Sequence, residues 1–209
     1  MGETASLNII KQTGNSETVV TKSRFIGYIT PVKDASEAES VINTLRKKYN
    51  DARHNPWAYI VMEGDLLNKK CSDDGEPSQT AGKPILSVLE GAHLVNAVCV
   101  VTRYFGGVLL GTGGLVRAYS DAAAKALETI PVIPIRLGRN LEILCDYSDE
   151  GTVRRMLESR EYVITNSSYA EKVTLSVLGP EEAGERLSLE ITDRTGGRAS
   201  VTMGDTEYI

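Results

Sequence analysis

Two glycine-bearing segments, residues 72–84 and 103–114, contain most of the side chains in this sequence that could do chemistry. The first carries three carboxylates within four residues, Asp73, Asp74 and Glu76. Such a cluster can hold a hard cation or accept hydrogen bonds from a partner. In a loop rich in Gly, Pro and Ser, however, Asp side chains commonly bond neighbouring backbone N–H groups. The ligand spacing of a calcium loop is missing, so this structural reading is favoured. No metal ion is assigned, although a magnesium site stays open.

The second segment leaves an apolar run and enters a helical pattern, with five glycines between positions 106 and 114. Glycines let backbone N–H groups approach a ligand closely, and at the start of a helix these groups and the helix dipole attract anions. Phosphate is therefore the natural candidate ligand. The predicted contact residues in this segment are Tyr104, Phe105, Gly106, Gly107, Gly111, Thr112, Gly113 and Gly114.

Two familiar nucleotide-binding patterns do not fit this segment. Gly106 and Gly111 have the spacing of a P-loop, but Thr112 stands where the phosphate-binding lysine belongs, and Gly113 replaces the magnesium-binding Ser or Thr. The dinucleotide pattern also fails, because Val116 occupies the place of its third glycine. A nucleotide hydrolase of the P-loop type is not expected, and no cofactor is assigned.

Two arginines and a histidine lie close to these segments in the sequence. Arg103 and Arg117 can each hold a phosphate through paired hydrogen bonds. The alternative for Arg117 is an ion pair with Asp121, one helical turn away. His54 is interpreted as a structural or contact residue rather than a general base, because the chain has no Gly-x-Ser-x-Gly nucleophile motif. No catalytic residue is assigned.

Hydrophobic periodicity predicts the elements that position these residues. Alternation indicates one long or two short strands over 17–32, and a hairpin of strands 57–63 and 66–71 with a turn at 64–65. Residues 34–49 have the helical period, with Ser36 and Glu39 at the spacing of a capping box. The pattern then predicts a short helix from Pro84 to about Gly91, a buried strand over 96–101 and a helix over 115–128.

Two prolines, Pro131 and Pro134, end a helical pattern and mark a domain boundary. They predict an N-terminal domain of residues 1–133 and a C-terminal domain of residues 134–209. The second domain is predicted to begin with a strand over 140–146 and a helix over 149–159. Two strands joined near 170–171 follow, and then a helix over 180–189 and a strand over 198–203. This β-α-β-β-α-β order is the ferredoxin-like arrangement, and the whole chain is assigned to the α+β class.

Composition excludes several classes of protein. With 41% hydrophobic and 24% charged residues the chain is an ordinary globular protein. It lacks a run of roughly 18 apolar residues and a secretory signal, and its three cysteines are widely spaced. We therefore expect a cytoplasmic protein without a membrane partner.

The net charge of −5 argues against a broad nucleic-acid-binding face. The excess of acidic residues is confined to the C-terminal domain, which has 9 Lys and Arg and 14 Asp and Glu, whereas the N-terminal domain has 14 basic and 14 acidic residues. A site for a polyanion is therefore better sought in the N-terminal domain, and no specificity for DNA is expected.

Several blocks of the sequence together resemble the IMPACT/YigZ family, in particular its bacterial YigZ-like members. The resemblance extends over essentially the whole chain. One departure is Gln79, where the family pattern has Gly. The matching blocks are Arg53-His54-Asn55, Ala58-Tyr59, Asp73-Asp74-Gly75-Glu76-Pro77, Thr80-Ala81-Gly82-x-Pro84, Val101-x-Arg103-Tyr104-Phe105-Gly106-Gly107-x-x-Leu110-Gly111, Gly114-Leu115 and Tyr119.

This resemblance implies a fold and a field of activity. The N-terminal domain would have the β-α fold shared by a small-subunit ribosomal protein, domain IV of elongation factor G and kinases of the galactokinase type. The C-terminal domain would be similar to the last domain of that elongation factor. Eukaryotic relatives act in translational control by binding the co-activator of an eIF2 kinase, whereas the resemblance implies no assigned reaction for bacterial members.

Three functions follow from these observations. The leading hypothesis is a non-enzymatic regulator that binds RNA, the ribosome or a translation-associated protein through the N-terminal domain. The alternative is an enzyme acting on a phosphorylated small molecule or nucleotide, with the glycine-rich loop as phosphate cradle, although it lacks the serines that the related kinases carry there. A third possibility is a protein-binding module that uses Tyr104 and Phe105 or the acidic C-terminal domain.

Overall fold

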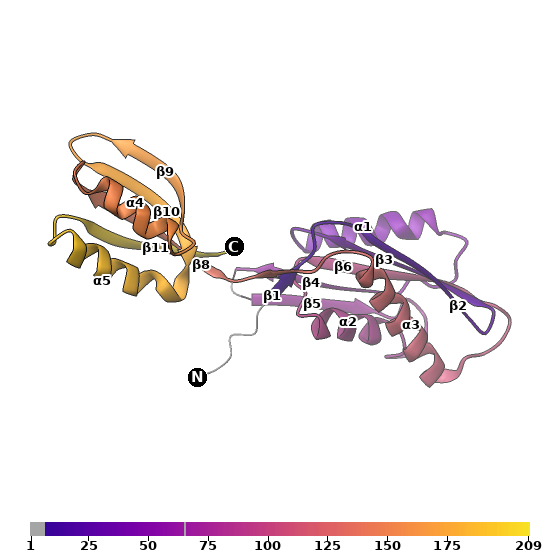
Figure 1. The fold of residues 1–209 in the computed structure, drawn as a ribbon. Helices are drawn as coiled ribbons and strands as arrows, with labels where there is room; N and C mark the ends of the chain where they lie inside the picture. Colours follow the sequence, from indigo (N-terminus) through magenta and orange to yellow (C-terminus); the bar gives the residue numbers. More distant parts are fainter. Residues whose placement is uncertain (1–6, 65) are drawn as a thin grey trace. The chain divides into compact units, whose positions relative to one another are not determined.

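The computed structural model of this protein describes residues 7–64 and 66–209. The chain divides into two compact units, one ending at Pro134 and the other beginning at Ile135. Each unit combines a β-sheet with helices, so the protein is an α+β protein in two parts (Figure 1). The turn predicted at 64–65 includes Asp65, which lies outside the described residues.

An antiparallel sheet forms the centre of the N-terminal unit, with strand order β2-β3-β6-β4-β5. Alternating apolar residues produce these strands, and the stretch 17–32 forms two strands, β2 and β3, instead of one. The shorter strands β1 and β7 pair with each other and were not predicted. The strands are β1 (Leu7–Ile9), β2 (Gly14–Val20), β3 (Ser23–Pro31), β4 (Trp57–Glu63), β5 (Leu66–Ser72), β6 (Ala97–Tyr104) and β7 (Ile133–Ile135).

Helices cover both faces of this sheet (Figure 1). On one face lies α1 (Ala35–Lys48), and its Ile42 and Leu45 share a hydrophobic cluster with Tyr59 of β4. On the other face lie α2 (Gly82–Gly91) and α3 (Gly111–Glu128). There the rings of Phe25 and Tyr119 meet edge to face, with their centroids 5.2 Å apart. Neighbouring residues of the central strands β4 and β6 therefore belong to two different cores.

The start of α1 differs from the prediction. Asp34, not Ser36, is the N-cap, and its carboxylate accepts a hydrogen bond from the backbone N–H of Glu37 at 2.8 Å. In turn, the carboxylate of Glu37 accepts a hydrogen bond from the backbone N–H of Lys33, next to the N-cap, at 2.7 Å. The capping pair is therefore Asp34 and Glu37, two residues earlier than the predicted pair of Ser36 and Glu39, because aspartate serves as well as serine at this position.

This assignment makes a testable prediction about stability. Replacing Asp34 by alanine should lower the free energy of unfolding of the N-terminal unit by about 1 kcal/mol, because one N–H of the first helical turn loses its acceptor. Ser36→Ala is the matched control and should change the free energy by less than about 0.5 kcal/mol. Urea unfolding followed by Trp57 fluorescence measures both variants. A larger loss of unfolding free energy for Ser36→Ala than for Asp34→Ala would show that the predicted pair, Ser36 and Glu39, caps the helix.

Helix α3 begins at Gly111, four residues before the predicted start. Glycine has low helix propensity, so the sequence pattern placed residues 111–114 in the preceding loop. The structure instead makes them the first turn of the helix. The N-cap is Leu110, which forms no side-chain capping bond. Only the stretch between β6 and Leu110 remains a loop.

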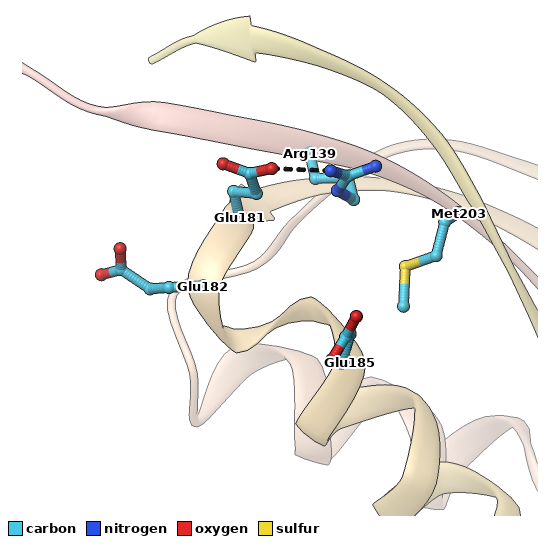
Figure 2. A pocket seen from close by; sticks show the side chains of 5 residues that line it. All are labelled: Arg139, Glu181, Glu182, Glu185 and Met203. Atoms are coloured by element: carbon cyan, nitrogen blue, oxygen red, sulfur yellow. Dashed lines mark hydrogen bonds and ion pairs between the residues drawn. The ribbon is translucent and has the colours of Figure 1, made fainter. Parts of the chain in front are cut away.

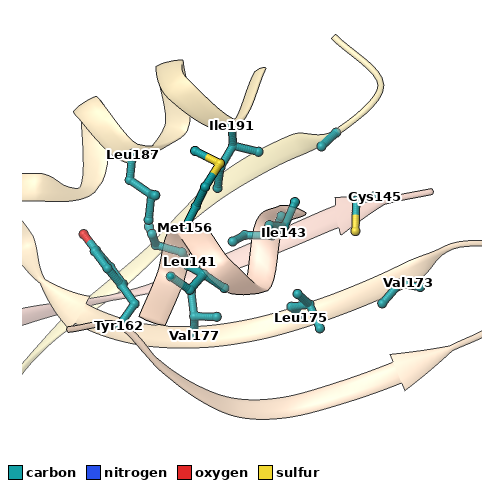
Figure 3. Close-up of a cluster of buried hydrophobic side chains, with 13 residues drawn as sticks. Leu141, Ile143, Cys145, Met156, Tyr162, Val173, Leu175, Val177, Leu187 and Ile191 are labelled. Carbon is teal, nitrogen blue, oxygen red and sulfur yellow. The ribbon is translucent and has the colours of Figure 1, made fainter. Parts of the chain in front are cut away.

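The C-terminal unit has the element order β-α-β-β-α-β and a sheet of strand order β11-β8-β10-β9. Its core lies between the sheet and the two helices, with Leu141, Met156 and Leu187 among the buried side chains (Figure 3). The second helix begins at Gly184 after a 3-10 turn and ends at Arg194, several residues later than predicted. The elements are β8 (Leu137–Cys145), α4 (Glu150–Glu158), β9 (Val163–Tyr169), β10 (Val173–Pro180), α5 (Gly184–Arg194) and β11 (Ser200–Tyr208).

None of the helices in the described part of the chain is long and apolar enough to cross a membrane.

Candidate functional site

The two glycine-bearing segments meet inside the N-terminal unit. A guanidinium nitrogen of Arg103, from the second segment, lies 2.7 Å from a carboxylate oxygen of Glu76, from the first. The hydroxyl of Tyr119 donates a hydrogen bond of 2.7 Å to the same oxygen. Arg103 and Glu76 are only 6% and 8% exposed. A buried charge is tolerated only when it is paired, so this network fixes the two segments against each other.

Aromatic rings complete the surroundings of the Arg103 guanidinium. Its central carbon lies 5.6 Å from the ring centroid of Phe25 and 5.5 Å from that of Phe105. The network also acts on Tyr119, because burial and the neighbouring Glu76 carboxylate raise the pKa of its hydroxyl far above the usual value. That hydroxyl therefore stays protonated and remains a hydrogen-bond donor. Arg103 is a positioning residue and does not present its charge to solvent.

The other two carboxylates of the first segment also bind within the protein. Asp73 accepts hydrogen bonds from the backbone N–H groups of Gln79, Ala81 and Gly82, at 2.8 to 2.9 Å. It thus holds the loop closed over the start of α2. The structure gives this acidic cluster the loop-building arrangement that its composition favoured.

Asp74 and His54 link the first segment to the chain ahead of β4. The Asp74 carboxylate accepts from Arg46 at 2.6 Å and from the backbone N–H of Asn55 at 2.7 Å. Nδ1 of His54 lies 2.8 Å from the backbone oxygen of Asp74. The imidazole is therefore directed at the polypeptide backbone, and the backbone carbonyl of His54 accepts from the N–H of Arg103.

The loop between β6 and α3 presents apolar side chains to solvent. Leu109 is 86% exposed, and Phe105 and Val108 are close to half exposed. The loop packs on the turn between β2 and β3, because the backbone N–H of Gly106 donates to the hydroxyl of Ser23 at 3.2 Å. Lys22, in this turn, is exposed.

Arg117 lies on the same side of the unit. It lines a depression of about 470 Å³ together with Thr21 and Leu109. The predicted alternative, a pair between Arg117 and Asp121, is not formed; Asp121, which also lines the depression, binds Lys125 at 2.8 Å instead. Arg117 is exposed. We call Lys22, Phe105, Val108, Leu109 and Arg117 the loop surface.

Most of the remaining predicted contact residues lie beside the loop surface. Gly107, Gly111, Thr112 and Gly113 are exposed beside the loop surface, and Gly114 is half-buried and lines the depression. Tyr104 points to the other side of β6, where its hydroxyl donates to Asp51 at 2.8 Å. The structure therefore gathers exposed glycines, apolar side chains and cations, and it places Asp73, Asp74 and Glu76 in the supporting framework.

Comparison with known proteins identifies the family. The model of the Impact N-terminal domain matches residues 21–127, and that of a domain of unknown function, DUF1949, matches residues 143–198. The IMPACT family member YvyE of Bacillus subtilis is 36% identical over 200 residues, which cover 96% of this chain and 92% of that protein. This chain belongs to the IMPACT family.

Other relatives agree with this assignment. The IMPACT family member YigZ of Escherichia coli is 33% identical over 85% of this chain and 88% of its own length. Protein IMPACT of Danio rerio is 34% identical over 94 residues, which are 43% of this chain and 29% of that protein. A crystal structure of a hypothetical protein is similar over 96% of this chain and 98% of its own, with a TM-score of 0.58 and 31% identity.

Sequence reasoning missed several residues of the site in this IMPACT family member. Phe25 and Lys22 lie some 80 positions before the glycine-rich loop, and only the pairing of β3 with β6 brings them together. Tyr119 was assigned to an apolar helix face, although its hydroxyl reaches Glu76. The register gives the one available signal, because Phe25 pairs with Arg103 and both therefore point to the same face.

The C-terminal unit holds a different kind of pocket, with a volume of about 340 Å³ (Figure 2). Arg139 pairs there with Glu181 at 2.6 Å, while Glu182 and Glu185 add two further carboxylates. The pocket is therefore acidic and unsuited to a phosphate. Across residues 7–64 and 66–209, no group of three or more His, Cys, Asp or Glu side chains is arranged to hold a metal ion.

Proposed function

We propose that this IMPACT family member is a non-enzymatic regulator associated with translation, and that it binds RNA, presented by the ribosome or free, through the loop surface. The observation that carries the proposal is the buried network of Arg103, Glu76 and Tyr119. It holds in place a loop whose exposed side chains have no structural role in the core. Rigid support lowers the entropic cost of binding.

The chemistry of the loop surface suits a nucleic acid. Lys22 and Arg117 can neutralise phosphates, which supplies most of the affinity for RNA. The exposed part of Phe105 can stack on an unpaired base. The net charge of the chain does not oppose this, because the excess of acidic residues lies beyond residue 133.

Likeness to translation proteins adds support of a weaker kind. The proposed ferredoxin-like character of the C-terminal unit, and the proposed likeness of the N-terminal unit to a ribosomal protein and to domain IV of elongation factor G, both point to the ribosome. Fold analogy alone does not determine function, so the proposal does not depend on this likeness.

The alternative of an enzyme for phosphorylated small molecules has less support. Such an enzyme needs carboxylates free to hold a metal or act as a base, but Asp73, Asp74 and Glu76 each bind protein groups. Arg103, a candidate phosphate ligand, is buried. Stabilisation of the N-terminal unit by a nucleotide with Mg²⁺ in a thermal-shift screen would support the enzyme instead.

Co-sedimentation with ribosomes tests the proposal. The double variant Lys22→Glu/Arg117→Glu should bind at least about tenfold more weakly than the wild type. A plot of the logarithm of its binding constant against the logarithm of the salt concentration should have a shallower slope, by the amount expected for the loss of about two phosphate contacts. Phe105→Ala should weaken binding without changing the salt dependence. The control is Lys11→Glu/Lys70→Glu, which reverses two exposed charges elsewhere. Equal binding by the two double variants, or no binding by the wild type, would reject the proposal.

A further inference from the structure

Arginine side chains gather in one groove of the C-terminal unit. The groove has a volume of about 520 Å³ and lies where α4 and α5 end. It is lined by Thr152, Arg155, Met156, Ser159, Arg160 and Arg194. Its size is within the range of small-molecule sites, roughly 300 to 1,000 Å³. Three guanidinium groups therefore border a space large enough for more than a single phosphate ion.

The positive charge of this groove is only partly neutralised. Arg160 pairs with Glu190, but that carboxylate also binds Arg186 at 3.1 Å, so it is shared. Nε of Arg155 donates to the backbone oxygen of Gly151 at 3.0 Å, which leaves the two terminal nitrogens of its guanidinium group available. Neither Arg155 nor Arg194 forms an ion pair with any residue that the structure describes.

This charge contrasts with the rest of the unit. The chain beyond residue 133 has 9 basic and 14 acidic residues, and its other pocket collects three glutamates around Arg139 (Figure 2). Basic residues near helix C-termini do stabilise the helix dipole, which accounts for one arginine at the end of each helix. It does not account for Arg155, Arg160 and Arg194 lining the same groove.

The lining groups indicate the chemical class of the ligand. Guanidinium groups bind phosphoryl oxygens through paired hydrogen bonds, and the half-buried Thr152 adds a hydroxyl donor. Met156, whose side chain reaches into the core (Figure 3), gives the groove an apolar wall. We propose that this groove binds a phosphorylated small molecule of about mononucleotide size, at a site separate from the loop surface.

Methyl NMR of the full chain tests this inference directly. The chain has four methionines, of which Met156 lines the arginine groove and Met203 lines the acidic pocket. With ¹³C-methyl methionine labelling, pyrophosphate and AMP should each shift the Met156 signal in a saturable way. The signals of Met62 and Met203 should stay in place. Inorganic phosphate should bind more weakly than pyrophosphate, because it reaches fewer of the guanidinium groups.

Arginine variants provide the control. Arg155→Gln/Arg194→Gln should weaken pyrophosphate binding by at least about tenfold, while an unchanged Met203 signal, from the other pocket of the same unit, shows that the unit is folded. Arg136→Gln/Lys172→Gln removes two exposed charges whose ion pairs lie outside the groove and should keep affinity within about twofold. The inference is overturned if Met156 does not shift at about 10 mM pyrophosphate, a concentration above that of even weak specific binding. Equal losses in the two variants would also overturn it.

Discussion

Replacing Glu76 by alanine should lower the free energy of unfolding of the N-terminal unit by about 3 to 5 kcal/mol, because it leaves the buried guanidinium of Arg103 without a counter-charge. Arg103 is 6% exposed, so water cannot take the place of the carboxylate. The rings of Phe25 and Phe105 attract the cation, but such contacts offer only about 0.5 to 2 kcal/mol. The same variant should detach the segment 72–84 from the glycine-rich loop.

Tyr119→Phe is the matched control, since it removes one hydrogen bond to the same oxygen and keeps the ion pair. Its expected cost is about 1 kcal/mol. The double variant Glu76→Leu/Arg103→Met removes both charges and should recover part of the loss, as apolar replacements of buried pairs commonly do.

Trp57 makes this measurement specific to one unit. It is the only tryptophan of the chain and lies in β4, so its fluorescence during urea unfolding reports the N-terminal unit alone. A loss for Glu76→Ala no larger than that for Tyr119→Phe would show that the ion pair does not support the loop.

The sequence predicted the elements whose periodicity extends over several residues. Most of the strands and both longer helices of the N-terminal unit follow from alternation or from a helical face. The three-residue strands β1 and β7 have too few residues to show a period, and they pair across more than 120 positions. Their pairing depends on the tertiary structure, which a local pattern does not contain.

The sequence pattern could not show where α3 begins or that Arg103 is buried, and both failures have physical reasons. Glycines at 113 and 114 favour a loop, yet tertiary structure makes them helical, and Gly111 begins the helix with a φ of 69° that suits glycine. Arg103 follows an apolar run and has the appearance of a loop residue. The alternation of β6 nevertheless continues through it, and places it on the face of Phe25. Its partner Glu76 is 27 positions away, so the pattern alone could not show that the charge is paired.

The candidate site shows the same division. The sequence singled out two segments as candidates, and the structure joins them through Arg103 and Glu76. The sequence could not show that Arg103 and Glu76 support the loop from inside while other residues are free to contact a partner, because that distinction depends on burial. The exposed cation Lys22 belongs to the turn between β2 and β3, and its place beside the glycine-rich loop depends on the strand order.

Gly106→Ala should have the second large effect, because position 106 has no room for a side chain. A Cβ there would lie 2.0 Å from the backbone carbonyl carbon of Lys22 and 2.1 Å from its oxygen. Backbone atoms cannot rotate away as a side chain can, so the loop or the β2–β3 turn must move. We expect a loss of about 2 to 3 kcal/mol in the free energy of unfolding, measured by Trp57 fluorescence in urea.

Gly113→Ala, in the same segment, is the control with the opposite sign. A Cβ at position 113 meets nothing within 4 Å, and the residue lies in the first turn of α3. Alanine there should stabilise the unit by about 0.5 to 1 kcal/mol, because it favours the helix and restricts the unfolded chain. If both variants changed stability by the same amount, the glycines would serve only flexibility, and the close packing of the loop on the β2–β3 turn would not be what positions Phe105 and Lys22.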